Sequence, residues 1–204
     1  MSLRLTEDGL VQLLARKNVK SLSSNTVLRK IVAPDQSLYE ILAVGELRLP
    51  KSPCVVALRN GLKAICDPTT KAKPFERVEQ AAALVWLELT HREAFEMTTT
   101  NPMGGYRPNG SGGQIKGEGA RKGYPDLLTD IPRLGYHGLR IEMKKFSERA
   151  EPTSEQLVWL TKLSWNGYRV ALCRGHQGAI TTFCDYFDIV KPQFDLPKWA
   201  IVYY

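Results

Sequence analysis

The sequence predicts a mixed α/β fold, in which a small β-sheet is flanked by helices and preceded by an N-terminal extension. After residue 74 the pattern runs helix, strand, strand, helix, strand, helix, which favours one small sheet with helices packed on its faces. Residues 139–144 alternate between apolar and polar side chains, as a half-buried strand does. Residues 98–123 are rich in glycine, and a loop of that length inside a compact domain is usually functional or disordered.

The composition is that of a globular protein with a sizeable core. The 204 residues are 43% hydrophobic, which is enough for at least one well-buried domain. No stretch approaches the roughly 18 consecutive apolar residues of a membrane span, so no membrane contact is expected. The first ten residues lack the basic-then-apolar pattern of a secretory signal, which predicts a cytoplasmic protein.

The cysteines and histidines predict no zinc site. They form no CxxC pair, no HExxH or HxH motif and no cluster with zinc-ligand spacing. In the absence of an export signal, four reduced thiols are expected in place of two disulfides. A metal in this protein would therefore be bound through oxygen. The residues concerned are Cys54, Cys66, Cys173, Cys184, His91, His137 and His176.

The formal net charge of +7 is unevenly distributed. Residues 1–75 hold 12 basic and 6 acidic side chains, residues 76–100 hold 2 and 5, and residues 101–150 hold 9 and 5. A basic chain with an acidic island suits a polyanionic ligand around a cation-binding centre. A solvated surface whose charge serves only solubility would give the same sums, and composition does not decide between the two.

Residues 1–74 form a basic N-terminal region whose overall fold does not follow from the sequence. Thr6, followed by two acidic residues and a leucine stripe, indicates a short capped helix. A second helix is expected after Ser23 and before Pro34. Further prolines divide the rest into short pieces, of which residues 54–58 are predicted as a strand.

The elements of residues 75–190 follow from hydrophobic periodicity. A long helix is predicted from Pro74 to about His91, because apolar residues recur there at helical spacing. The other expected elements are strands near 126–128, at 139–144 and at 168–173, and helices over about 154–166 and 177–186. The tail, residues 191–204, ends in a strand-like apolar run that either covers the core or forms part of an interface.

Residues suited to catalysis gather around the strand 139–144. Its alternation directs Glu142 and Lys144 to one face, roughly 7 Å apart, and their apolar neighbours to the other. Alone, such a pair is equally typical of a surface ion pair worth well under about 1 kcal/mol. The neighbouring sequence favours a catalytic site, because Asp126 follows Pro125 at the start of a predicted strand only sixteen residues upstream.

A series of motifs follows a characteristic order along the chain. A helix carries Glu76 and Gln80, and the glycine-rich loop ends in Lys116-x-x-Gly119-x-x-x-Gly123-x-Pro125-Asp126. Residues 135–139 (GYHGL) lead into Glu142-x-Lys144, residues 152–156 (PTSEQ) open a helix, and residues 167–170 (GYRV) enter a strand. In this order, over about residues 74–190, the sequence resembles the VRR-NUC branch of the PD-(D/E)XK nuclease superfamily, with its restriction-endonuclease-like core.

The resemblance implies a Mg²⁺-dependent DNA endonuclease in which Mn²⁺ substitutes for Mg²⁺. Asp126 and Glu142 would bind the metal directly, the carbonyl of Met143 would add a third oxygen, and Glu76 would bind directly or through water. These are the hard oxygen ligands that Mg²⁺ requires. Lys144 would orient the attacking water and stabilise developing negative charge.

Several site residues have a second interpretation. Glu79, one turn beyond Glu76, is a rival ligand from the helix. Gln156 would lie by the active site, but with Thr153 it also fits a capping box, and one side chain can serve both ends. The basic loop residues are candidate phosphate contacts or ordinary solvated side chains. They are Arg107, Lys116, Arg121 and Lys122.

The implied substrate is branched DNA such as a four-way junction. Stand-alone VRR-NUC proteins of phage and bacteria resemble junction-resolving homodimers, so a homodimer is expected, in the host cytoplasm if the gene is a phage gene. Two other classes stay open: a non-catalytic DNA-binding or inhibitory protein on a nuclease scaffold, and a sequence-specific restriction-type enzyme. Residues 1–74 are expected to add DNA contacts beside the cut site, or else to serve packing or dimerisation.

Overall fold

The computed structural model describes residues 36–101, 117 and 119–204, and the chain divides into two compact units, Met1–Leu89 and Thr90–Tyr204. The helices predicted near Thr6 and Ser23 lie outside the described residues. Within those described ranges, no helix combines the length and the apolar character that crossing a membrane requires.

The described part of the N-terminal unit is helical, with α3 (Gln36–Arg48), α4 (Pro53–Cys66) and α5 (Phe75–Thr90). Helix α5 confirms the helix predicted after Pro74. The strand predicted at residues 54–58 is wrong, because these residues lie in the first turns of α4. The side chain of Ser52 caps α4 by accepting hydrogen bonds from the N–H groups of Cys54 and Val55, and Pro53 stands where a helix tolerates proline.

The three helices share a core of their own. Small residues allow the close approach: a Cβ on Gly45 would lie 3.0 Å from Val55 and from Val85, and one on Gly61 would lie 2.5 Å from Val78. The apolar positions of α4 recur every three or four residues, which directs them all to this core. The buried members are Leu38, Leu42, Val55, Leu58, Leu62, Ile65, Val78, Ala81, Ala82 and Val85.

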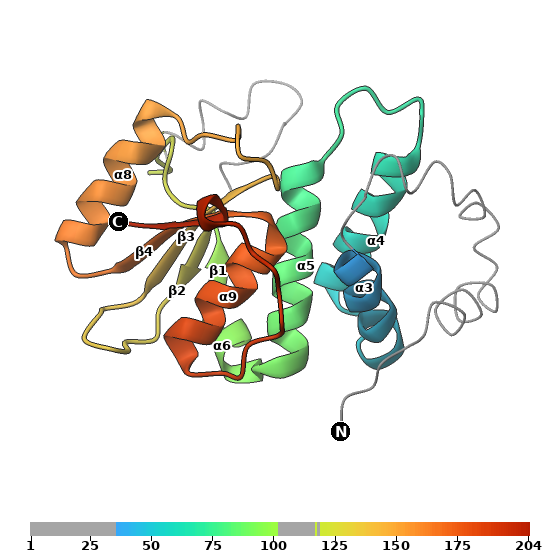
Figure 1. The fold of residues 1–204 in the computed structure, drawn as a ribbon, viewed down its shortest axis with the longest axis horizontal. Coiled ribbons are helices and arrows are strands. Elements are labelled where there is room, and N and C mark those ends of the chain that lie inside the picture. Colours follow the sequence, from blue (N-terminus) through green and yellow to red (C-terminus); the bar gives the residue numbers. More distant parts are fainter. Residues whose placement is uncertain (1–35, 102–116, 118) are drawn as a thin grey trace. The chain divides into compact units, whose positions relative to one another are not determined.

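The C-terminal unit is built around a five-stranded sheet with the order β1-β2-β3-β4-β5. Only β3 and β4 run parallel to each other, and the other neighbours are antiparallel. The elements in chain order are α6 (Arg92–Glu96), β1 (Thr98–Thr100), β2 (Leu127–Thr129), β3 (Leu139–Lys144), α8 (Ser154–Trp165), β4 (Arg169–Arg174), α9 (Gly175–Phe187), the 3-10 turn η2 (Lys198–Ala200) and β5 (Ile201–Tyr203). This arrangement confirms the predicted small mixed sheet with helices (Figure 1).

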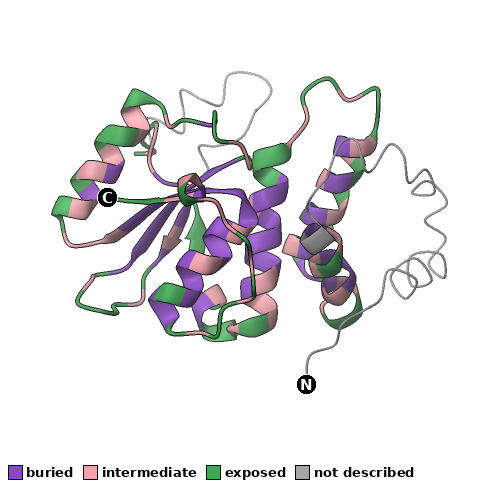
Figure 2. Ribbon diagram, viewed as in Figure 1, coloured by how far each residue is buried: buried purple, intermediate pink, exposed green. Residues whose placement is uncertain are grey.

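Helices α8 and α9 cover opposite faces of the sheet. Leu160 and Leu163 of α8 pack against Val170 of β4, which is paired with Arg140 and so lies on the face that bears Glu142. On the other face, Cys173 of β4 contacts the Thr182 hydroxyl of α9 at 3.3 Å. The central strands are consequently buried along almost their whole length (Figure 2).

The C-terminal tail completes the sheet. Strand β5 pairs antiparallel with β4, with Leu172 opposite Val202. Arg174, at the end of β4, donates from Nη1 to the carbonyl of Trp199 at 2.7 Å and so fixes the turn that precedes β5. The strand-like run predicted at the end of the chain is therefore the edge strand of the sheet, and its side chains are half-buried or exposed.

Candidate active site

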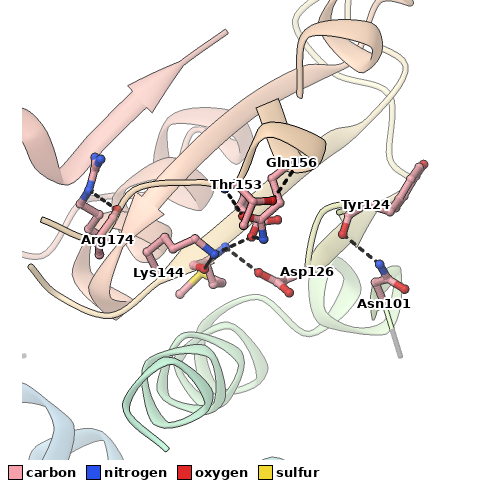
Figure 3. A network of polar contacts seen from close by, with 10 residues as sticks. Asn101, Tyr124, Asp126, Lys144, Thr153, Gln156 and Arg174 are labelled. Carbon is pink, nitrogen blue, oxygen red and sulfur yellow. Dashed lines mark hydrogen bonds and ion pairs between the residues drawn. The ribbon is translucent and has the colours of Figure 1, made fainter. Parts of the chain in front are cut away.

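Asp126 lies at the entrance to β2, against the second half of β3. The antiparallel register places Leu127 opposite Ile141, so the preceding residue is a neighbour of Glu142 and Met143. The Asp126 carboxylate accepts a hydrogen bond from the Met143 N–H at 2.9 Å, and its carbonyl accepts one from the N–H of Asn101 at 2.9 Å. Hydrogen bonds thus hold both the side chain and the main chain of Asp126, and its side chain points toward β3 (Figure 3).

Glu142 and Lys144 form a buried pair and not the surface pair that the sequence left open. Glu142 is 0% and Lys144 8% exposed. The Lys144 ammonium donates to Glu142 Oε1 at 2.8 Å and to the Met143 carbonyl at 3.1 Å. Removing two charges from water costs several kcal/mol per ion, which the pairing offsets only in part. A buried pair of this kind is therefore weak evidence for stability and marks a candidate site.

Gln156 caps α8 and also contacts Glu142. Thr153 accepts from the Gln156 N–H, and the Gln156 side-chain oxygen accepts from the Thr153 N–H at 2.8 Å, which completes a capping box at the start of α8. The Gln156 amide nitrogen also donates to Glu142 Oε1 (Figure 3). The first turn of α8 is thereby tied to the Glu142 carboxylate.

Gly123 allows the loop before Asp126 to pass close to that helix start. Its φ is +79°, and a Cβ there would lie 2.8 Å from the main-chain carbon of Glu155 and 2.9 Å from the nitrogen of Gln156. Only glycine combines this backbone conformation with this approach. The glycine of the G-x-P-D motif therefore sets the distance between the Asp126 loop and the α8 turn that contacts Glu142.

Gly123→Ala is expected to destabilise the protein by more than the roughly 1–2 kcal/mol that a left-handed non-glycine residue costs, because main-chain atoms must also move. Gly135→Ala is the matched control, since Gly135 has φ +81° but nothing within 4 Å of its Cβ position. Urea unfolding of the two variants measures the difference. Equal losses of stability in the two variants would contradict a role for the close approach of Gly123 to the start of α8.

Burial raises the pKa of Asp126 above its ordinary value. The hydrogen bond from the Met143 N–H, the positive charge of Lys144 and a hydrogen bond with the Glu142 side chain all act in the opposite direction, but burial outweighs them. Two carboxyl groups in such contact, away from bulk water, need a proton or a cation between them. The pair is thus chemically suited to hold a cation in place of a proton.

The donor set suits a hard divalent cation. Asp126 and Glu142 offer carboxylate oxygens and Met143 offers a carbonyl, with no nitrogen or sulfur ligand that would favour zinc. Among the residues described, no three side chains of His, Cys, Asp or Glu come together as a metal-binding group. These residues would therefore supply part of the coordination shell, and Mg²⁺ commonly completes such a shell with water.

Asp126→Asn is expected to raise the melting temperature of the metal-free protein by a few degrees near neutral pH. Because the folded pKa is raised, the ionised carboxylate destabilises the native state above that pKa, and this cost disappears below the unfolded value of about 3.9. The gain should therefore shrink as the pH falls toward 4, when unfolding is followed in EDTA. In excess Mg²⁺ the wild type should have the higher melting temperature, because only the wild type is expected to be stabilised by Mg²⁺ binding. A variant that is less stable at every pH in EDTA would contradict this account.

The two candidate ligands on α5 differ in burial. Glu76 is exposed in the first turn, and Glu79 is 7% exposed. Both belong to the N-terminal unit, whereas Asp126 and Glu142 belong to the other. The assignment of a ligand to α5 therefore stays a prediction.

Of the basic loop residues, Arg107 and Lys116 lie outside the described residues, and Arg121 and Lys122 are exposed. The Lys122 ammonium pairs with Glu155 at 2.5 Å, and the Lys122 carbonyl accepts from the indole of Trp159 at 3.2 Å. The hydrogen bond with Lys122 lowers the pKa of Glu155 to about 2. Part of the Lys122 charge is therefore neutralised beside the site.

Sequence reasoning missed Arg174. It is 4% exposed and donates from Nε to the carbonyl of Ala150 at 2.9 Å and from Nη2 to Glu151 at 2.9 Å. These contacts hold the segment that leads into Thr153, and hence the start of α8 (Figure 3). The available signal was an arginine directly after the apolar run 170–173, where a charge needs partners to be buried.

The comparisons with known proteins find a structural similarity. No family model matches the sequence, and no curated protein matches it. A solved structure described as a "VRR_NUC domain protein" has 26% sequence identity with this chain. The match covers 57% of this chain and 91% of that one, with a TM-score of 0.49. Over a little more than half of its length, the chain is thus similar to a VRR_NUC domain protein, and VRR-NUC is the family that its motifs resemble.

Proposed function

We propose that the protein is a metal-dependent DNA endonuclease, with its catalytic centre on β2, β3 and the start of α8. The observation that carries the proposal is the contact network of Asp126, Glu142, Lys144 and Gln156. It combines two adjoining carboxyl groups with a buried ammonium, which is costly to fold and suited to phosphodiester hydrolysis. A non-catalytic scaffold would have no need to retain this set.

Asp126, Glu142 and the Met143 carbonyl would hold Mg²⁺ or Mn²⁺, and Glu76 or Glu79 is the proposed further ligand. Bound there, the cation would lower the pKa of a coordinated water and neutralise phosphate charge. Hydrolysis adds the water oxygen to phosphorus and breaks the bond to the leaving oxygen, which takes up a proton. Lys144, held by Glu142 and Met143, would direct its ammonium at the water and at the charge that develops on the phosphate.

Gln156 is proposed to orient the Glu142 carboxylate. Thr153→Ala removes the capping hydroxyl and should cost about 1 kcal/mol of stability while leaving cleavage nearly unchanged. Gln156→Ala removes both the cap and the contact with Glu142, and should also slow single-turnover cleavage at least about tenfold. Equal cleavage rates of the two variants would show that Gln156 acts only as a cap.

The proposed substrate is branched DNA, cut by a homodimer that places one site on each of two strands. A four-way junction requires two symmetric cuts, which a twofold dimer supplies. Arg107, Lys116, Arg121 and Lys122 are the proposed phosphate contacts of the loop.

Single-turnover cleavage of duplex, single-stranded, flap and four-way-junction DNA of the same sequence tests this. The expected result is metal-dependent cutting that is fastest on the junction. Faster cutting of plain duplex would reject the structure preference but leave the nuclease assignment in place.

A further inference from the structure

We propose that α3 and α4 form a helix-turn-helix that binds duplex DNA through the exposed face of α4. This surface lies in the N-terminal unit and is distinct from the strands that carry the catalytic network. The inference shares with the proposed function only the premise that the ligand is DNA. It gives a specific site to the basic charge of the N-terminal region.

The connection between the two helices has the length of a helix-turn-helix. Helix α3 ends at Arg48 and α4 begins at Pro53, which leaves four residues for the turn. The turn is ordered by hydrogen bonds from the Leu49 N–H to the Gly45 carbonyl at 2.7 Å and from the Ser52 N–H to the Leu49 carbonyl at 3.0 Å. Close approach at Gly45 lets the side chain of Val55 pack directly on α3.

A third helix supports the turn, as in helix-turn-helix domains. The Ser52 hydroxyl, which caps α4, also donates to Glu88 of α5 at 2.6 Å. Residues of α3, α4 and α5 contribute to one apolar core. Helix α4 is thus held on one side and its N-terminus is anchored, so its other face is presented on a rigid base.

That other face has the composition of a surface that contacts nucleic acid. Its exposed positions recur at helical spacing and are small, amide or basic: Pro53, Val56, Ala57, Asn60 and Lys63. Buried and exposed positions alternate along α4 accordingly (Figure 2). An amide side chain can read adenine in the major groove, and small apolar ones can contact a thymine methyl group.

Charge complementarity identifies the partner as a polyanion. Residues 47–66 contain Arg48, Lys51, Arg59 and Lys63 and no acidic residue. Arg59 is occupied by Glu46 at 2.5 Å, whereas Arg48, Lys51 and Lys63 are exposed. Lys51 lies in the turn before α4 and Lys63 in the last turn of α4, so a cation lies at each end of the exposed face. This spacing suits phosphates on either side of a groove.

The test is DNA binding by the full-length chain with Lys51→Ala and Lys63→Ala combined. Affinity for a 30-base-pair duplex is measured by fluorescence anisotropy without divalent metal, over a series of salt concentrations. The matched control combines Arg92→Ala with Lys191→Ala, which removes the same charge from exposed positions of the other unit. For the Lys51/Lys63 variant, we expect the negative slope of log affinity against log salt to become shallower by about 2, at roughly 0.9 per phosphate contact. For the control variant, the slope should stay near that of the wild type.

Asn60→Ala then separates base contact from charge. It should leave the salt slope unchanged and weaken the preference among duplexes of different sequence, if α4 enters the groove. An unchanged slope in the Lys51/Lys63 variant, or an equal fall in both double variants, would overturn the proposal. A change of oligomeric state in light scattering, with the slope unchanged, would assign the face to protein contact instead.

Cleavage in Mg²⁺ is measured on the same proteins at low salt. If the wild type cuts DNA but α4 does not affect binding, the helix-turn-helix is rejected and the nuclease stands. If α4 controls binding but the wild type cuts nothing, the proposed function fails and the DNA-binding site stands.

Discussion

Glu142→Gln is expected to reduce cleavage on the order of a thousandfold or more, with folding intact. The substituted amide keeps an oxygen that can accept from Lys144 and Gln156, so the contacts around the residue are retained. What disappears is the negative charge that would hold the cation at a fully buried position. Single-turnover cleavage and thermal unfolding, measured on the same preparation, separate the two effects.

Glu148→Gln is the control for this variant. Glu148 is exposed in the segment after β3 and is neutralised by the same substitution. It should cut DNA at the wild-type rate. Normal turnover by the Glu142→Gln protein would remove Glu142 from the catalytic centre.

Lys144→Ala is expected to lose roughly a hundred- to a thousandfold in cleavage while binding DNA almost as tightly as the wild type. Lys144 is 8% exposed and its ammonium is held by Glu142 and Met143, so it contributes little to general phosphate attraction. Exposed basic residues such as Arg121 are the proposed source of that attraction. Anisotropy without metal gives the binding, and single-turnover kinetics gives the chemistry.

The Lys144→Ala experiment needs a control variant and a stability measurement. Lys145→Ala removes an exposed neighbouring charge and should affect neither measurement by more than about twofold. Lys144→Ala also leaves the Glu142 charge with one partner fewer in a buried place, so its melting temperature must be recorded. A parallel loss of binding and cleavage would make Lys144 a tether for DNA and not a catalytic group.

The sheet and its helices were predictable where local pattern and tertiary environment agree. Residues 139–144 alternate strictly and form β3 with the predicted bounds, and the Thr153–Gln156 capping box marks the start of α8. The order of motifs placed Asp126 beside Glu142. Antiparallel pairing of β2 and β3 is the physical reason that residues sixteen apart in sequence become neighbours.

The predictions from sequence were wrong or incomplete where tertiary contacts determine the local structure or the burial of a residue. Residues 54–58 contain two adjacent valines, which favour a strand, but the cap at Ser52 and a core shared with α3 and α5 make them helical. The polar face of β3 is buried because α8 covers it, which alternation within a single strand cannot show. Arg174 depends on partners at Ala150 and Trp199, which are distant in sequence.

Metal dependence is the direct test of the proposed nuclease, because the Asp126–Glu142 pair is proposed to act only with a cation. One four-way junction is incubated with the wild-type protein in Mg²⁺, in Mn²⁺, in Ca²⁺ and in EDTA, under single-turnover conditions. We expect cutting in Mg²⁺ and Mn²⁺, none in EDTA, and recovery when excess Mg²⁺ is added back to the EDTA sample. Cleavage in EDTA at the rate seen in Mg²⁺ would contradict the proposed metal dependence.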